Sequence, residues 1–340
     1  MEQAETVIAP SVTVGAPAER KPGKLVLAAL KIGVSASLIA WVLQGTPLPE
    51  IVAALGKADF RLLLFAFSLH LLGLVLSAYR WRLLLRARGS DSSILFLVES
   101  YIVGMFFNNL LPSTIGGDVY RSYDSWRLGQ SKSSAVAIVF VDRFLGLLVL
   151  ILLALLALLN ANELTAAIPH LFAWLGLGTI GMISFLWLIF APPQWLADVT
   201  AKLNLPFGTK IRQIIAAFLA FQGHRRVLGR ALVLSVLLQV NVIIHYYLIA
   251  RSLSLPVPFL GFFLIVPLAT ILTMLPISVN GIGVRENVYL FFFAAFAVSP
   301  PETVAFAWIA YGLVVLQGLL GGILYALRRP APHRRTNRHP

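Results

Sequence analysis

Two arginines follow the same short pattern in two apolar regions of this chain. Each copy has a Leu-Pro pair, a glycine five residues after the proline and an arginine nine residues after it. An arginine among apolar residues is costly inside a membrane, so a pattern that repeats it at equal spacing indicates a duplicated membrane protein with its working site between the halves. The copies are Leu111, Pro112, Gly117 and Arg121, and Leu275, Pro276, Gly281 and Arg285.

The first copy has residue types that suit an anion. Pro112 ends a helix, and Gly116 and Gly117 permit tight backbone turns. A helix that begins after them has free N–H groups, which attract phosphate, and the guanidinium fork of Arg121 matches phosphate oxygens. Asp118 lies three residues before Arg121, on the same helix face, so the two can pair. Two readings stay open: Arg121 contacts a lipid phosphate, or Asp118 and Arg121 form a structural ion pair.

The second copy is built around an Asn-Gly turn. Asn280 and Gly281 are a strong turn signal, and Gly283 follows two residues later. The run from Gly281 to Glu286 lacks the third glycine of a dinucleotide fingerprint and has no strand before it, so nucleotide binding is not expected. We expect Glu286 to neutralise Arg285 or an arginine elsewhere, and Arg285 to face its counterpart Arg121 across a pseudo-twofold axis.

Two further charges, Asp142 and Arg143, lie within the apolar run 134–159. Adjacent helical residues point in different directions, so each needs a partner elsewhere, unless both side chains reach the membrane surface. We expect those partners among the charges of the two copies. The candidate substrate-binding residues are Asn108, Asp118, Arg121, Asp142, Arg143, Asn280, Arg285 and Glu286, and the turn residues are Pro112, Gly116, Gly117, Pro276, Gly281 and Gly283.

Composition places these residues in an all-α polytopic membrane protein. The chain of 340 residues is 59% hydrophobic and only 12% charged, whereas soluble domains have about 25% charged residues. There is no cysteine, and no spacing of a nucleophile–base pair or metal ligands, so we expect no catalytic site, metal or cofactor. The net charge of +13 suits membrane orientation and anionic lipid better than nucleic acid. Six spans are predicted, near 25–43, 61–79, 134–159, 168–190, 231–250 and 303–327.

The distribution of basic residues predicts the topology. Basic residues after 79, within 198–230 and after 327 indicate cytoplasmic loops, while 160–170 and 299–302 have none and should lie outside. Counting the membrane crossings needed between these loops makes 94–124 and 259–298 two re-entrant helical hairpins, which enter from opposite faces of the membrane. The halves, about 25–160 and 166–327, then form an inverted repeat. The alternative is that both stretches span the membrane fully.

The remaining segments complete the predicted organisation. Residues 25–327 form a single membrane domain. Residues 1–24 are predicted to be a disordered tail without a signal peptide, and 328–340 a basic cytoplasmic tail. Both termini should lie on the cytoplasmic side of the plasma (inner) membrane. Residues 209–222 are predicted to form an amphipathic helix on the cytoplasmic surface, or a plain connector.

Three segments carry a resemblance to a known family. The run from Asn108 to Arg121, the Val-Asp-Arg-Phe-Leu-Gly run around Asp142, and the run from Leu275 to Glu286 resemble the motifs of the lysylphosphatidylglycerol synthase transmembrane-region family, also called flippase-like or UPF0104. The resemblance covers about 25–327. It implies that Asp118, Arg121, Asp142, Arg143, Arg285 and Glu286 are the functional charges. The full synthase also has a soluble acyltransferase domain after its membrane region. This chain stops at Pro340, so we expect no aminoacyl-lipid synthesis here.

Function is therefore expected at the level of a membrane lipid. The first hypothesis is a flippase-like protein that moves an anionic or aminoacylated phospholipid between leaflets through a polar crevice. The alternative is an accessory subunit or enzyme of polyprenyl-phosphate or lipid-linked sugar metabolism. A scaffold for a partner enzyme would leave the buried arginines without a purpose. The expected partner is a membrane lipid, either a phospholipid or a polyprenyl-phosphate lipid. A second copy of this chain and a lipid-modifying enzyme are both open as protein partners.

Overall fold

The described part of the chain is entirely helical. A computed structural model describes residues 22–110, 115–158, 221–275 and 277–327, together with 173, 176–181 and 183–184, and has no strand within them. Four of its helices are long and apolar enough to cross a membrane: α3 (Phe60–Ala87), α6 (Lys132–Leu158), α11 (Arg225–Ser252) and α14 (Pro300–Leu327). The prediction of an all-helical membrane protein is confirmed for these ranges. Of the predicted span near 168–190 only residues 173, 176–181 and 183–184 are described, and the predicted amphipathic helix 209–222 lies outside the described residues except for 221 and 222.

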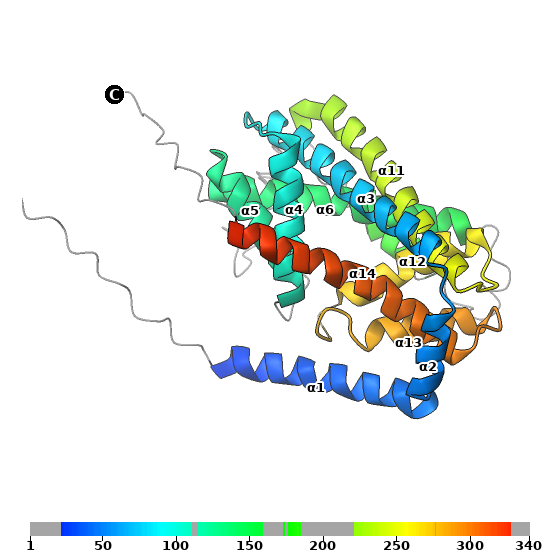
Figure 1. Cartoon of the computed structure of the whole chain (residues 1–340). Helices are drawn as coiled ribbons and strands as arrows, with labels where there is room; N and C mark the ends of the chain where they lie inside the picture. The colour runs from blue at the N-terminus through cyan, green and yellow to red at the C-terminus, as the bar shows by residue number, and fades with distance from the viewer. Residues whose placement is uncertain are drawn as a thin grey trace, which may run out of the picture.

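The first predicted span, 25–43, lies within α1, and a second short helix bends away after it. Helix α1 (Pro22–Gly45) is followed by the short α2 (Leu48–Gly56), and the two axes meet at 82°. Pro47 precedes α2 in extended backbone, as expected for a residue that cannot continue the helix before it. In Figure 1, α1 lies along the lower edge of the molecule and α2 turns up toward α14.

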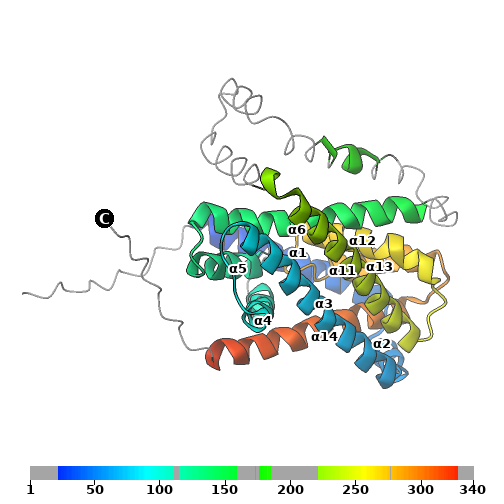
Figure 2. The same cartoon turned by 90° about the horizontal axis from the view of Figure 1, so that it is seen from above.

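Helices α3 and α11 run antiparallel and in contact along their length (Figure 1). The direction is shown by three cross-helix contacts, in which higher residue numbers on one helix meet lower numbers on the other. His245 Nδ1 lies 2.7 Å from the main-chain oxygen of Ala66, Asn241 donates to that of Leu69 at 2.8 Å, and Arg80 donates to Ser235 at 2.8 Å. The contact is close because Gly73 has no side chain to hold the helices apart: a Cβ there would lie 3.1 Å from the Asn241 amide nitrogen. Figure 2 shows α6 lying against this pair.

Both copies of the Leu-Pro pattern join two shorter helices. In the first, α4 (Ile94–Leu110) precedes the break and α5 (Gly116–Arg127) follows it. In the second, α12 (Phe259–Met274) precedes the break and α13 (Val284–Ala294) follows it. Each second helix packs on the first, and α5 also packs on α6 and α13 on α14. The two copies therefore have the same local layout. Pro112 and Pro276 themselves lie outside the described residues.

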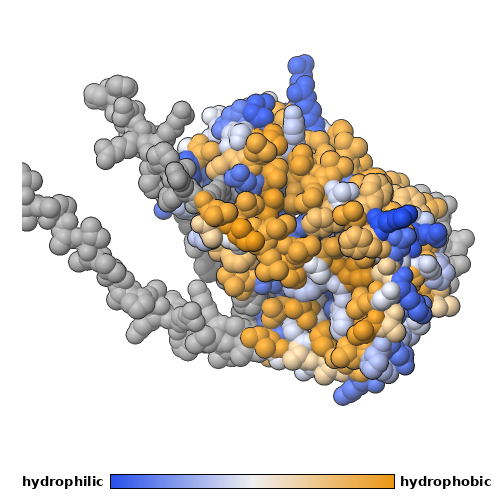
Figure 3. Space-filling view, in the orientation of Figure 1, coloured by the Kyte–Doolittle hydropathy of each residue, from blue (hydrophilic) through white to orange (hydrophobic). Residues whose placement is uncertain are grey.

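The surface is largely apolar. Figure 3 shows hydrophobic residues over most of the visible face, with hydrophilic residues gathered toward its ends. Large aliphatic and aromatic side chains are exposed along the long helices, for example Leu64 on α3, Val233 on α11 and Leu319 on α14. An apolar area of this extent is unfavourable in water and is expected where lipid chains surround the helices.

Candidate functional site

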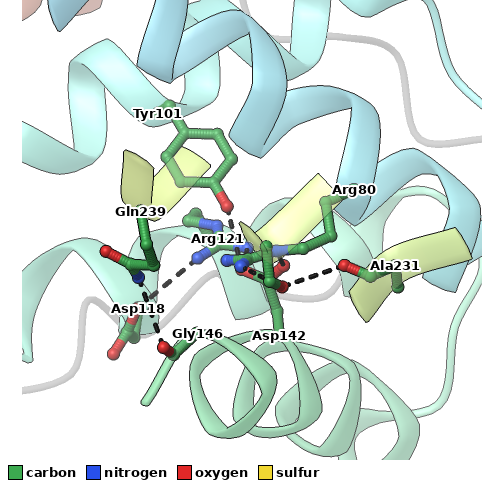
Figure 4. A network of polar contacts seen from close by, with 9 residues as sticks. Arg80, Tyr101, Asp118, Arg121, Asp142, Gly146, Ala231 and Gln239 are labelled. Carbon is green, nitrogen blue, oxygen red and sulfur yellow. Dashed lines mark hydrogen bonds and ion pairs between the residues drawn. The ribbon is translucent and has the colours of Figure 1, made fainter. Parts of the chain in front are cut away.

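One carboxylate organises the buried charges of the first half. Asp142, in the middle of α6, accepts from Arg80 Nε at 2.6 Å, from Arg121 Nη2 at 2.8 Å and from the Tyr101 hydroxyl at 2.9 Å (Figure 4). All three charged side chains are buried: the exposed fractions are 1% for Asp142, 6% for Arg80 and 5% for Arg121. Helices α3, α4, α5 and α6 each contribute one member, so the contacts tie four elements together. We call Arg80, Tyr101, Asp118, Arg121, Asp142 and Arg143 the Asp142 network.

Asp118 and Arg143 extend this network toward the surface. Arg143 Nε lies 2.5 Å from Asp118 Oδ2, and Asp118 Oδ1 lies 3.7 Å from Arg121 Nη1. We expected partners for Asp142 and Arg143 among the charges of the two copies; the structure pairs Asp142 with Arg121 and Arg143 with Asp118, both of the first copy, and adds Arg80, which belongs to neither. Three guanidinium groups and two carboxylates leave the network with a net charge of +1.

Arg121 is held on its faces as well as at its nitrogens. Its guanidinium carbon lies 4.0 Å from the ring centre of Tyr101 and 4.7 Å from that of Trp81. A planar guanidinium stacked on aromatic rings gains cation–π attraction, which grows when the group is desolvated. Two carboxylates and two rings thus surround the guanidinium group, and only its Nε is buried without a hydrogen-bond partner. This placement agrees with the ion-pair reading of Asp118 and Arg121.

Arg80 is a site residue that the sequence reasoning assigned wrongly. We expected the second span to end at 79 and Arg80 to lie in a cytoplasmic loop, but α3 continues to Ala87. Arg80 is buried, and besides Asp142 it donates to Ser235 of α11. The signal was present as a helical stripe, because Gly73, Ser77, Arg80 and Leu84 recur every three or four residues and all face the interior.

The glycines of the two copies have different structural roles. Gly281 (φ 75°) and Gly283 (φ 82°) occupy the left-handed region, as the turn prediction requires. Gly116 and Gly117 instead begin α5, so their predicted role in a turn is wrong. Gly117 is needed for close approach: a Cβ there would lie 2.7 Å from the main-chain oxygen of Gly104 on α4.

Arg285 has a different environment from Arg121. Its Nη2 donates to the main-chain oxygen of Asn280 at 3.1 Å, and its guanidinium carbon lies 4.3 Å from the Tyr311 ring centre. No carboxylate pairs with it in the part of the chain that the structure describes. Glu286, its expected partner, turns back and accepts from the main-chain N–H of Gly283 at 2.8 Å. Our expectation that Glu286 neutralises an arginine is therefore wrong, because it caps its own helix instead.

The two breaks meet directly. Asn280 Nδ2 donates to the main-chain oxygen of Asn108 at 2.7 Å, and Asn108 Oδ1 accepts from the main-chain N–H of Gly117 at 2.6 Å. Asn109 donates to the main-chain oxygen of Val314 on α14 at 3.3 Å, and α14 also carries Tyr311 beneath Arg285. We call this contact region, made by Asn108, Asn109, Asn280, Arg285 and Tyr311, the break junction. Arg121 and Arg285 make no direct contact with each other among the described residues.

Several buried polar atoms near the junction lack a hydrogen-bond partner. They are Ser278 Oγ, Asn280 Oδ1 and Arg285 Nη1. A buried polar atom without a partner costs about 1–3 kcal/mol, and native proteins rarely leave several together without a water, ion or ligand to satisfy them. The described residues contain no group of three or more His, Asp or Glu side chains arranged to hold a metal ion. The junction instead offers unpartnered hydrogen-bond donors, an unpartnered acceptor and one positive charge.

Comparison with known proteins shows the family to which the chain belongs. The family model described as "Lysylphosphatidylglycerol synthase TM region" matches residues 28–334. A UPF0104 membrane protein of Methanothermobacter thermautotrophicus is 29% identical over 278 residues, covering 75% of this chain and 82% of the relative. A UPF0104 membrane protein of Pyrococcus horikoshii is 24% identical over 329 residues, covering 88% of this chain and 97% of the relative. Since the family model spans most of the chain, including both breaks and the Asp142 network, this protein belongs to the lysylphosphatidylglycerol synthase transmembrane-region family.

Proposed function

We propose that this protein binds an anionic or aminoacylated phospholipid and moves its headgroup between leaflets through the region where the two breaks meet. The observation that carries the proposal is Arg285, a guanidinium without a carboxylate partner among the described residues, one of whose nitrogens is buried and unsatisfied. A phosphate oxygen would supply the missing acceptor and the missing negative charge. The acyl chains would stay in the bilayer while the headgroup passes.

The proposal assigns different roles to the two matching arginines. Arg121 is bound by Asp142 and Asp118, so a lipid phosphate would have to displace an existing buried ion pair. Arg285 requires no such displacement. We therefore assign substrate contact to Arg285 and Asn280, and assign Arg121 to holding α5 against α6. About a third of the Arg143 side chain is exposed, so this residue is the member of the Asp142 network that an approaching headgroup would contact.

The proposal includes a membrane topology for the two helix pairs that flank the breaks. We infer that α4–α5 and α12–α13 are re-entrant hairpins in an inverted repeat, which would bring the junction to the middle of the bilayer. The supporting observations are the matched helix–break–helix layout of the copies and the short apolar helices α4 and α12. Non-helical backbone at that depth must be enclosed by protein or line a wet cavity, and α14 packs on both α4 and α13 beside the breaks.

The test is transbilayer movement of a labelled phospholipid in proteoliposomes, followed by chemical quenching of label in the outer leaflet. Arg285→Gln should slow movement at least about tenfold, since a charge-assisted bond to phosphate contributes more than about 1.4 kcal/mol. Arg251→Gln, at the exposed end of α11, is the matched control and should move lipid at the original rate. Unchanged movement in Arg285→Gln would refute the proposal.

Two further measurements separate alternatives. Thermal unfolding in detergent shows whether Arg285→Gln still folds; we expect Arg121→Gln to be the less stable variant, because it breaks a buried ion pair. The alternative of an enzyme acting on polyprenyl-phosphate or lipid-linked sugar predicts chemical change in the lipid. Mass spectrometry of the recovered lipid would detect that change, and its appearance would replace transport as the proposed function.

A further inference from the structure

A second candidate site lies away from the break junction, on the outer side of the α3–α11 pair. A pocket of about 700 Å³ runs between the two helices and is lined by Tyr79 and Leu83 of α3 and by Arg226, Gly229, Arg230, Val233 and Leu234 of α11. Tyr79 and Val233 are exposed, with 49% and 61% of their surface accessible, so the pocket opens outward. Neither the Asp142 network nor the break junction includes any of these residues.

The basic end of this pocket has two arginines of α11. Arg226 and Arg230 are one helical turn apart and share one face of α11, and neither pairs with a carboxylate in the described part of the chain. The neighbouring basic residues of α3 differ, because Arg82 and Arg86 both bind Asp91, at 2.7 and 2.8 Å. Two adjacent guanidinium groups without counter-ions repel each other, and a bound anion would relieve that repulsion.

The rest of the pocket is apolar and lies further along the helix. Val233 follows Arg226 by seven residues, which corresponds to about 10 Å along the helix axis. The polar zone of a bilayer is roughly 5–8 Å deep on each side. Guanidinium groups at headgroup level therefore place Val233 and Leu234 beside the upper acyl chains. Gly229 borders open space, because a Cβ there would meet nothing within 4 Å.

We propose that this pocket is a resident site for one anionic phospholipid of the surrounding bilayer, with its phosphate between Arg226 and Arg230 and an acyl chain along Val233 and Leu83. The order of groups along the pocket, positive and then apolar, matches the order of groups in a phospholipid. Basic pockets between membrane helices recognise anionic headgroups in this way. The bound lipid would stabilise the contact between α3 and α11. Arg80 of α3 donates to Ser235 of α11 and so links this helix pair to the Asp142 network. The inference does not depend on transport.

The experiment measures lipid retained by the purified full chain. Protein from vesicles of equal phosphatidylglycerol and phosphatidylcholine is extracted gently, and the lipids that stay bound are counted by native mass spectrometry. The original chain should retain one phosphatidylglycerol in preference to phosphatidylcholine. The double variant Arg226→Gln/Arg230→Gln should lose that preference by about tenfold or more. Val233→Trp keeps the charges, fills the apolar end and should also reduce retention.

Controls distinguish this site from others. Arg251→Gln removes one charge from the opposite end of α11 and should retain lipid normally. Arg285→Gln removes only what the break junction binds, so the preference that depends on Arg226 and Arg230 should persist in it. Equal retention by the double variant and the original chain would overturn the proposal. Stabilisation of the original chain by inorganic phosphate alone, to the same extent as by phosphatidylglycerol, would also overturn it, because the acyl chain would then contribute nothing.

Discussion

Asn280 donates from Nδ2 to the main-chain oxygen of Asn108 at 2.7 Å, so residues 172 positions apart join the two copies of the Leu-Pro pattern at their breaks. That bond also determines the orientation of the Asn280 amide, because a carbonyl oxygen can only accept. Oδ1 must therefore be the atom that is buried without a partner. A ligand at the junction thus meets a donor in Arg285 and an acceptor in Asn280.

This pairing predicts a preference for headgroups that carry N–H or O–H groups. Phosphatidylethanolamine should bind about tenfold more tightly than phosphatidylcholine, whose methylated amine cannot donate to Asn280 Oδ1. The measurement is competition between the two lipids in nanodiscs. Asn280→Gly removes the amide but tolerates the left-handed backbone at this position (φ 52°), and should bind both lipids alike. A preference that survives in Asn280→Gly would contradict this role of Oδ1.

The Asp142 network predicts an asymmetry in stability. Asp142→Asn leaves Arg80 and Arg121 buried without a carboxylate between them and should lower the free energy of unfolding by about 3–5 kcal/mol. Arg143→Gln should cost much less, because that side chain is 35% exposed and water can replace its partner. Denaturant unfolding in detergent provides both values. Equal losses in the two variants would mean that Asp142 is not the centre of the network.

Contact between α14 and α4 predicts a second, purely steric effect. Gly321 packs against the main-chain oxygen of Ile102, with no room for a Cβ, whereas a Cβ on Gly312 of the same helix would meet nothing within 4 Å. Gly321→Ala should therefore destabilise the protein by about 1–3 kcal/mol. Gly312→Ala should be neutral or slightly stabilising, since alanine favours helix. Thermal unfolding of the pair in one detergent compares them, and equal stability would refute the close contact.

A surface carboxylate predicts how the loop between α3 and α4 responds to pH. Hydrogen bonds from Arg86 and Arg82 hold the pKa of Asp91 well below its ordinary value. A lowered pKa in the folded state means that the contribution of Asp91 to stability is present above its ordinary pKa, near 3.9, and is lost as the pH falls through the lowered value. Carboxyl NMR of the labelled aspartates should show that the Asp91 carboxyl is still ionised below pH 3. Asp91→Asn should remove that signal and leave the others.

Sequence patterns predicted a large part of the candidate site. Buried charges in apolar runs need partners, and that rule predicted partners for Asp142 and Arg143 among the charges of the two copies. The Asn-Gly signal predicted the left-handed turn at Gly281. Both rules use local properties, the cost of a charge in lipid and the backbone freedom of glycine, which do not depend on the rest of the fold.

The amino-acid sequence by itself determined that this protein is helical, belongs in a membrane and carries a duplicated pattern around two arginines. Only the tertiary structure decided which charges pair. Arg121 and Arg285 occupy matching positions, yet one lies against Asp142 and the other has no carboxylate beside it among the described residues. The sequence pattern predicted that Arg80 lies in a loop, whereas α3 continues past it and positions its side chain against Asp142. The physical reason is that a partner separated by 60 residues is chosen by helix packing, and no local spacing encodes that packing.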